Sequence, residues 1–308
     1  MTQAPAPQTA APQTGTPQTA TSPDPQDRAV RDAWYAVGFL DHLPPGNHHT
    51  SLLGTDLLIR RQDHGTFRVT AGDTLLPTAL RHGCLWTSLG TPPASPVAIP
   101  EAAEPDRRLV CCGSVAVHAS GLRVVENFLD LAHFPFVHTG ILGAEPHTEV
   151  ARYHTELRRD ATDSMTGGAT EVWATDCRFH QPQAARSAQA ALETRYIYRV
   201  ATPFVTLLYK TCPNDPVRPD VIALFVQPTA PDRCLAHPVM FLLDDFSPQA
   251  DLVQFQQRIF LQDRIILENQ RPRLLPLDPR AEIPTRADSL SVAYRRWLKE
   301  QNIRYGAT

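Results

Sequence analysis

The stretch Glu126-Asn-Phe-Leu-Asp-Leu-Ala-His133-Phe-Pro-Phe-Val-His138 holds the residue types on which both the chemistry and the fold depend. On a helix, steps of three residues turn about 300°, so Asn127, Asp130 and His133 are predicted to lie near one face. His138 follows His133 by five residues, about 140° around a straight helix. Pro135 lies between the two histidines and is expected to bend the helix, which brings both imidazole rings to one point.

This grouping is typical of a metal site. Two histidines and a carboxylate form the facial ligand set of non-haem Fe(II), which leaves open positions for O₂. The spacing alone leaves a second interpretation open, in which the histidines are ordinary surface or core residues that fall five apart by chance. A second candidate segment, residues 260–270, reads as a late helix that carries Asp263. That acid is alternatively a solvated residue on an ordinary charged helix face.

The string N-x-x-D-x-x-H-x-x-x-x-H resembles the mononuclear iron motif in the catalytic subunits of the Rieske non-haem iron oxygenases. The segment around Asp263 is similar to the family's late helix with the third ligand, and the likeness covers roughly residues 31–305. The resemblance implies that His133, His138 and Asp263 bind one Fe(II). It also implies that Asp130 links the iron site to an incoming electron carrier and that Asn127 lies beside the metal.

The family's second motif is missing from these 308 residues. A Rieske [2Fe–2S] centre needs two cysteines and two histidines, which the family supplies as C-x-H followed by C-x-x-H. The sequence contains no C-x-H, and its single C-x-x-H, Cys177 to His180, lies inside the predicted catalytic region. We therefore expect no [2Fe–2S] cluster in this chain. In this respect it resembles the cluster-less catalytic components of bacterial methylxanthine N7-demethylase systems.

That departure determines the partners we expect. Oxygen activation for a monooxygenation takes two electrons from outside the substrate, whereas one mononuclear Fe(II) readily gives one. The electrons are therefore expected to come from NAD(P)H indirectly, through a reductase or a homologous subunit that carries the Rieske cluster. The resemblance further implies a trimer-based homo- or hetero-oligomer.

The hydrophobic pattern predicts an α+β fold in three parts. Residues 1–27 repeat a Pro-Gln-Thr unit and are expected to form a disordered tail. Residues 28–110 contain short β-rich runs and, by the resemblance, form a truncated Rieske-like β domain without cluster ligands. Residues 111–308 form the mononuclear iron catalytic domain, an antiparallel sheet covered by helices. Its predicted strands are 114–118, 171–179, 192–200, 205–210, 221–227 and 237–243, and its predicted helices are 125–138, 249–270 and 289–301.

Composition excludes several classes of function. The net charge of −3 and the absence of long Lys/Arg runs argue against nucleic-acid binding. No stretch approaches 18 consecutive apolar residues and the N-terminus lacks a signal-peptide pattern, so we expect a cytoplasmic protein with no membrane association. The six cysteines have no framework spacing, which predicts free thiols.

The expected reaction is hydroxylation by Fe(II) and O₂ of an N-methyl, O-methyl or ring carbon of a planar heterocyclic or aromatic small molecule, with N-demethylation favoured by the resemblance. The alternative is a non-catalytic structural subunit that stabilises an active homologue. Retention of all three ligand residues favours catalysis. Aromatic residues are expected to form the walls of the substrate site: Phe134, Phe136, Phe204, Tyr209 and Phe225.

Two further patterns remain as alternatives. His147-Thr-Glu149 and His154-Thr-Glu156 each fit the H-x-E part of a 2-oxoglutarate-dependent oxygenase site, with His180 or His237 as a distant third ligand. Such short patterns are expected by chance in a chain with 12 histidines. A basic group near the C-terminus is either the solvated face of the last helix or a docking patch for an acidic electron carrier; it comprises Arg286, Arg295, Arg296, Lys299 and Arg304.

Overall fold

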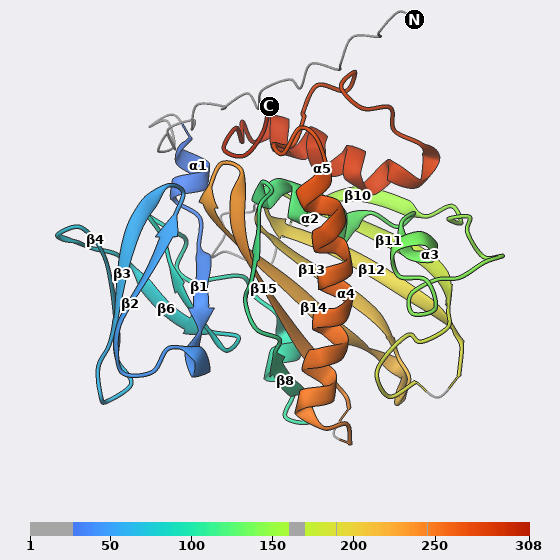
Figure 1. Cartoon of the computed structure of the whole chain (residues 1–308), viewed down its shortest axis with the longest axis horizontal. Coiled ribbons are helices and arrows are strands. Elements are labelled where there is room, and N and C mark those ends of the chain that lie inside the picture. The colour runs from blue at the N-terminus through green and yellow to red at the C-terminus, as the bar shows by residue number, and fades with distance from the viewer. Residues whose placement is uncertain (1–26, 160–169, 189, 245) are drawn as a thin grey trace, which may run out of the picture.

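A large antiparallel sheet dominates the computed structural model, which describes residues 27–159, 170–188, 190–244 and 246–308. The predicted tail lies outside the described residues except for Asp27. Figure 1 shows one long helix, α4 (Gln249–Asn269), crossing the sheet, with a smaller β-rich unit beside it. This arrangement confirms the predicted α+β class with a helix-covered antiparallel sheet.

The large sheet has the order β10-β11-β12-β13-β14-β15-β8, and β9 also pairs with β15. Its members are β8 (Arg108–Cys111), β9 (Val115–Val117), β10 (His154–Arg159), β11 (Thr170–Gln181), β12 (Leu192–Thr202), β13 (Val205–Cys212), β14 (Asp215–Ala230) and β15 (Arg233–Leu242). The strands predicted after residue 113 correspond to β9 and to β11 through β15. The sequence pattern missed β10, which is a polar edge strand.

Both faces of the central strands are covered. In β14, residues 220–228 are all buried, because one face packs under α4 and the other packs against the small β unit. Tyr198, Leu208, Ile222 and Met240 lie opposite one another across four strands and face α4. Strands buried on both sides read as continuous apolar runs, which is why this part of the sheet was recognisable from the sequence.

The small β unit contains two sheets, of order β1-β7-β6 and β2-β3-β4-β5. Its short helix and strands are α1 (Arg28–Arg31), β1 (Tyr35–Phe39), β2 (Gly46–Leu52), β3 (Thr55–Arg61), β4 (Phe67–Ala71), β5 (Thr74–Leu75), β6 (Thr78–Arg81) and β7 (Cys84–Thr87). The predicted boundary at residues 110 and 111 falls inside β8, which belongs to the large sheet. The division into two domains therefore stays a prediction.

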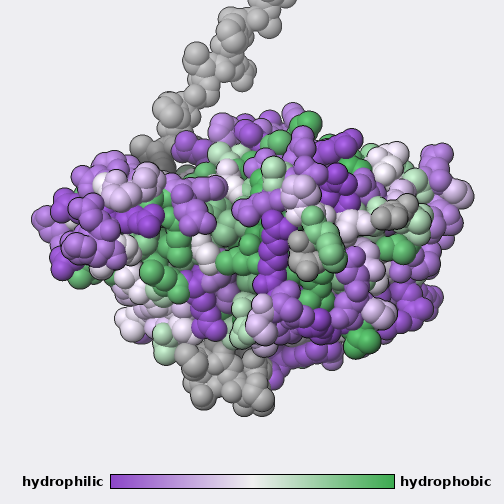
Figure 2. All heavy atoms as spheres, turned by 90° about the horizontal axis from the view of Figure 1, so that it is seen from below, coloured by the Kyte–Doolittle hydropathy of each residue, from purple (hydrophilic) through white to green (hydrophobic). Residues whose placement is uncertain are grey.

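The remaining helices are α2 (Gly121–Leu129), α3 (Phe134–Val137) and α5 (Ser289–Glu300). The bounds of α4 and α5 agree with the predicted helices to within one residue. Of the helices in the described ranges, none has the length and apolar content needed to span a membrane. On the face shown in Figure 2, hydrophilic side chains surround several hydrophobic patches.

His237 lies at the junction between the small β unit and the large sheet. Its Nδ1 is 2.8 Å from Ser114 Oγ and its Nε2 is 3.1 Å from Gln227 Oε1. The Gln227 side chain in turn donates to Thr50 Oγ1 and to the Ser51 carbonyl, both on β2. Burial lowers the pKa of His237 to about 4. The folded protein therefore holds this ring neutral at neutral pH.

Acid is expected to destabilise the fold through this residue. Between pH 6.5 and about 4, the unfolded chain binds a proton at His237 that the folded chain excludes, so stability falls as pH falls. Urea unfolding at pH 7 and pH 4.5, with EDTA present, measures this loss. His237→Gln should reduce the loss between these two pH values by about 2 kcal/mol, the part of the pKa difference that this pH range covers. The control His64→Gln lies on an exposed turn and should leave it unchanged; equal losses in both variants would contradict the assignment.

Candidate metal centre

The segment between α2 and α3 is not the single bent helix that the sequence predicts. α2 ends at Leu129, Asp130 takes an extended backbone conformation, and its Oδ1 accepts a hydrogen bond from the Ala132 N–H at 2.8 Å. A short aspartate side chain that binds a nearby N–H competes with helix continuation. Pro135 then lies in the first turn of α3, where its missing N–H costs nothing. Two helices with a break between them therefore place His133 and His138.

The side chains of His133, His138 and Asp263 meet at one point. The two Nε2 atoms are 3.1 Å apart, and Asp263 Oδ1 lies 3.3 Å from His133 Nε2 and 3.0 Å from His138 Nε2. Neighbouring ligands about 2.1 Å from an octahedral metal lie about 3.0 Å apart, so these atoms occupy one face of such an octahedron. In the described part of the chain, this is the one His, Cys, Asp and Glu group with metal-binding geometry.

The donor chemistry of the cluster fits a cation. His138 Nδ1 lies 2.9 Å from Gln262 Oε1, an oxygen that accepts hydrogen bonds, so Nδ1 is a ring nitrogen that carries a proton. His133 Nδ1 faces Asp130 Oδ2 at 3.4 Å, which favours the same tautomer. When both rings are neutral, as metal binding requires, their Nε2 atoms present lone pairs to each other and to a carboxylate oxygen. A metal ion at their meeting point would satisfy all three.

The charges around the cluster point in the same direction. Burial lowers the pKa of His133, but the carboxylates of Asp130 and Asp263 outweigh it and raise the pKa to about 9. Burial raises the pKa of Asp263, and its contacts with the two histidines outweigh this and hold the pKa below its usual range. The site therefore attracts positive charge, whether as protons or as a metal.

Asn127 and Asp130 both lie at the cluster, as the sequence predicts. Asn127 Nδ2 is 3.5 Å from Asp263 Oδ1, so the amide borders the carboxylate. Asp130 faces the ring nitrogen of His133 that points away from the other two groups. The sequence analysis did not predict a role for Gln262. Its position next to Asp263, a candidate ligand, was the one feature that could have identified it.

A cavity of about 90 Å³ opens on one side of the cluster, between α4 and the large sheet. Most of its lining is apolar or aromatic and includes Phe128, Tyr196, Tyr198, Ile222, Met240 and Phe255. Of the five predicted wall residues, Phe134 alone lines it. The other four point elsewhere: Phe136 is 67% exposed, Phe204 packs on Tyr35, Phe225 packs on Trp86, and Tyr209 lines a cavity on the opposite face of the sheet.

A second cavity, of about 640 Å³, lies on the other side of His133 and reaches Asp130. Arg295, Arg296 and Lys299 line it, so part of the predicted C-terminal basic group faces this space. Arg295 is not a free cation, because it forms ion pairs with Glu126 and Glu282. Arg123, 1% exposed, pairs with the same two acids and ties α2 to the C-terminal segment.

The alternative H-x-E patterns do not form a metal site among the described residues. The His147 ring packs on the His180 ring at 4.4 Å, and His180 Nδ1 contacts Glu193 Oε1 at 3.0 Å. His237 is buried with Ser114 and Gln227 as its partners. His154 is exposed and lies 3.9 Å from Glu156. The six cysteines are free thiols, as predicted.

Comparison with known proteins gives the family. Residues 117–302 match the vanillate O-demethylase oxygenase C-terminal domain. The chain belongs to this family of Rieske-type oxygenases. A probable methylxanthine N7-demethylase, NdmC, from Pseudomonas sp. (strain TJI-51) is 49% identical over 282 residues, which are 91% of this chain and 97% of that protein. As a member of the Rieske oxygenase family, the protein is an oxygenase enzyme, and iron binding is expected.

Solved structures of Rieske oxygenases have the same fold. NdmA from Pseudomonas putida CBB5, solved with caffeine, has a TM-score of 0.72 at 16% identity and covers 89% of this chain and 92% of its own. Dicamba monooxygenase bound to 3,6-dichlorosalicylic acid has a TM-score of 0.66 at 14% identity, covering 88% and 97%. The predicted fold of a Rieske oxygenase catalytic chain is thus confirmed.

Removal of one ligand should empty the metal centre. We expect His138→Ala to lose at least about 90% of the bound iron, because two remaining ligands hold a divalent ion poorly. The control His154→Ala removes an exposed imidazole far from the cluster and should keep the wild-type iron content. Iron is measured per chain after anaerobic purification and Fe(II) loading. Stoichiometric iron in His138→Ala would show that the cluster is not the metal site.

Proposed function

We propose that the protein is the catalytic component of a methylxanthine N-demethylase, with one Fe(II) held by His133, His138 and Asp263. The observation that carries the proposal is the facial donor set at the mouth of an aromatic cavity. It occurs in a chain 49% identical to a probable N7-demethylase over nearly that protein's whole length. A bound Fe(II) would supply O₂ activation at this point.

The reaction balances as a monooxygenation. One O₂, two electrons and two protons convert an N-methyl group into N-hydroxymethyl and water. The N-hydroxymethyl product then breaks its C–N bond and releases formaldehyde, leaving the ring nitrogen with a proton. Within this reaction the aromatic and apolar walls exclude water and orient a planar ring, while Gln262 fixes the His138 ring through its Nδ1.

Electrons from a second protein are part of the proposal, because these 308 residues contain no C-x-H to complete a Rieske ligand set. We infer that a Rieske-bearing reductase, itself reduced by NAD(P)H, delivers them on the Asp130 side of the centre. The second cavity, whose lining includes Arg295, Arg296 and Lys299, reaches Asp130 and His133. Asp130 lines this cavity, and its carboxylate faces the Nδ1 of His133, whose Nε2 points to the cluster. A trimer-based assembly with such a partner stays a prediction.

Reconstitution tests the reaction. The iron-loaded protein, a Rieske-bearing reductase and NADH are expected to release formaldehyde from 7-methylxanthine in step with oxygen uptake. Omission of the reductase should abolish product, since the chain alone has no route for electrons from NADH. A ring-hydroxylated product without formaldehyde would reject demethylation. Turnover by the chain and NADH alone would reject the need for a donor.

Asp130 is tested separately from the metal. Asp130→Asn keeps the size of the side chain but removes its charge. We expect near-normal iron content with formaldehyde release lowered about 10- to 100-fold, the size of effect seen for groups that orient metal ligands. Asp63→Asn, on an exposed turn of the small β unit, serves as control and should be unaffected. Single-turnover reduction by the partner, followed by stopped flow, locates the loss. Normal turnover in Asp130→Asn would show that Asp130 has no part in electron entry.

A further inference from the structure

Four charged residues besides Asp263 line the α4 cavity: Arg186, Lys210, Asp220 and Asp244. Arg186 forms an ion pair with Asp251 and Asp244 accepts hydrogen bonds from Ser247, which leaves Lys210 and Asp220 for a ligand. Lys210 on β13 and Asp220 on β14 are cross-strand partners that point to the same face of the sheet. They are 5% and 3% exposed, respectively. The chain has 27 arginines and only two lysines, so a buried lysine among the apolar cavity walls is an unusual choice. Buried charges are normally paired or used.

The surroundings of Lys210 leave donor capacity for a ligand. Its ammonium donates to the Ala184 carbonyl and lies 5.9 Å from the centre of the Tyr196 ring. An ammonium has three N–H donors, and the described residues provide neither a second hydrogen bond nor an ion pair for it. Burial lowers the pKa of Lys210 to about 8, so the ammonium is kept at neutral pH.

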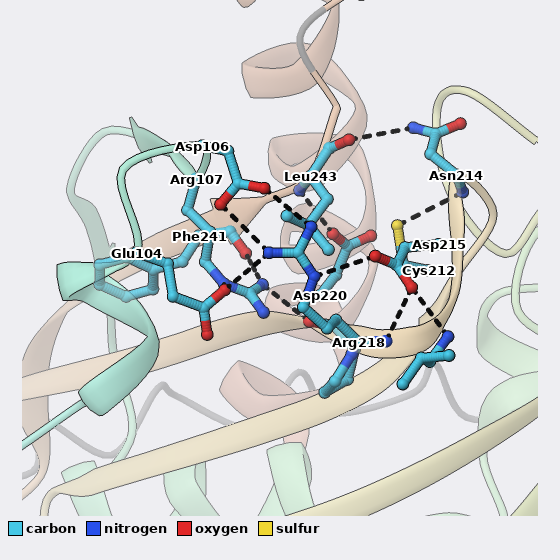
Figure 3. Close-up of polar contacts among 12 residues, drawn as sticks. Glu104, Asp106, Arg107, Cys212, Asn214, Asp215, Arg218, Asp220, Phe241 and Leu243 are labelled. Atoms are coloured by element: carbon cyan, nitrogen blue, oxygen red, sulfur yellow. Dashed lines mark hydrogen bonds and ion pairs between the residues drawn. The ribbon is translucent and has the colours of Figure 1, made fainter.

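Asp220 is fixed in place by the backbone around it. Its Oδ1 accepts the Leu243 N–H at 3.0 Å, as Figure 3 shows. Arg107 donates to the carbonyl of Pro219, the residue before Asp220, at 2.7 Å and to that of Phe241 on the neighbouring strand β15 at 3.3 Å. The carboxylate therefore holds one position beside Lys210, as a preorganised acceptor requires.

The cavity connects this pair to the metal cluster. The Phe134 ring lies 6.2 Å from the His138 ring and 6.1 Å from the Tyr196 ring. The Tyr196 ring in turn lies 5.9 Å from the Lys210 ammonium. The cluster and the pair line the same cavity, so one bound molecule can contact both.

We propose that Lys210 and Asp220 recognise a ring carbonyl and the adjacent ring N–H on the edge of the substrate opposite the methyl group that is oxidised. The ammonium donates to the carbonyl oxygen, and the carboxylate accepts the N–H. The inference rests on the proposed function and deepens it. A methylxanthine held by its N7-methyl end presents its pyrimidinedione ring to this pair. Methylation of the nitrogens of that ring removes the N–H and adds bulk where the acceptor lies.

The consequence is a defined preference among methylxanthines. The wild-type protein should bind 7-methylxanthine, whose pyrimidinedione nitrogens carry protons, at least about tenfold more tightly than caffeine, in which both are methylated. A site built to hydrogen-bond an N–H discriminates strongly against an analogue without it, because its buried polar groups are left unpaired.

The test is a comparison of dissociation constants for the two ligands, measured by equilibrium dialysis with the iron-loaded, anaerobic protein. Lys210→Met keeps the length of the side chain and removes its charge, and Asp220→Asn keeps the shape and removes the anionic acceptor. Both should bind 7-methylxanthine at least about tenfold more weakly and bring the preference over caffeine to within about threefold. Arg68→Met is the control, since it removes an exposed cation on β4 of the small β unit, outside this cavity, and should keep both constants.

The ratio of the two constants does not depend on how much of a variant is folded, so a purely structural effect leaves it unchanged. Iron content gives a second check of folding. A wild-type preference that persists in Lys210→Met and Asp220→Asn would overturn the role of the pair and leave the demethylase proposal standing. Failure of the wild-type protein to bind either methylxanthine would overturn the proposed function itself.

Discussion

The structure depends on one electrostatic constraint, the convergence of two imidazole nitrogens and a carboxylate oxygen within 3.0–3.3 Å of one another. Lone pairs at this separation repel unless a cation lies between them. The break between α2 and α3 lets two histidines of one short segment point to the same place. The long helix α4 crosses the sheet and brings Asp263 and Gln262 to these histidines.

The centre separates two spaces of different character. The α4 cavity is lined mainly by aromatic and aliphatic side chains, with the charged pair Lys210 and Asp220 set apart from the cluster. The cavity on the Asp130 side has apolar walls that include Ile266, Leu267 and Ile283, but it also carries more charged side chains, among them arginines, a lysine and glutamates. An apolar space suits a flat, uncharged ring, and charged side chains around a cavity suit a transient protein partner. The three proposed ligand residues thus lie between the proposed substrate and the proposed source of electrons.

Much of the fold was predictable, because the signals were local. The buried run of β14 and the long α4 pattern each identify an element without reference to the rest of the chain. The break after Leu129 was not predictable in this way, since it depends on which hydrogen bond the Asp130 side chain makes. The proposed ligand role of Asp263 came from a family resemblance, because no local pattern joins it to His138, 125 residues earlier in the sequence.

The cavity walls were harder to predict, and the reason is the two-residue period of a strand. Tyr209 and Phe225 are as apolar as the true lining residues, but each is one position away from a residue that faces α4, so it points to the opposite side. The same alternation places Lys210 in the cavity beside Tyr209, which is outside it. Only the register between strands reveals this difference, and a single sequence does not contain that register.

The most direct test of the central claim combines the metal and the substrate in one measurement. Nitric oxide bound to the Fe(II) protein gives a paramagnetic centre, and pulsed electron paramagnetic resonance detects nuclei close to it. With 7-methylxanthine deuterated in its N7-methyl group, the account predicts couplings from two imidazole nitrogens and from the methyl deuterons. A paramagnetic centre without two imidazole couplings, or without deuterium coupling from bound substrate, would contradict it.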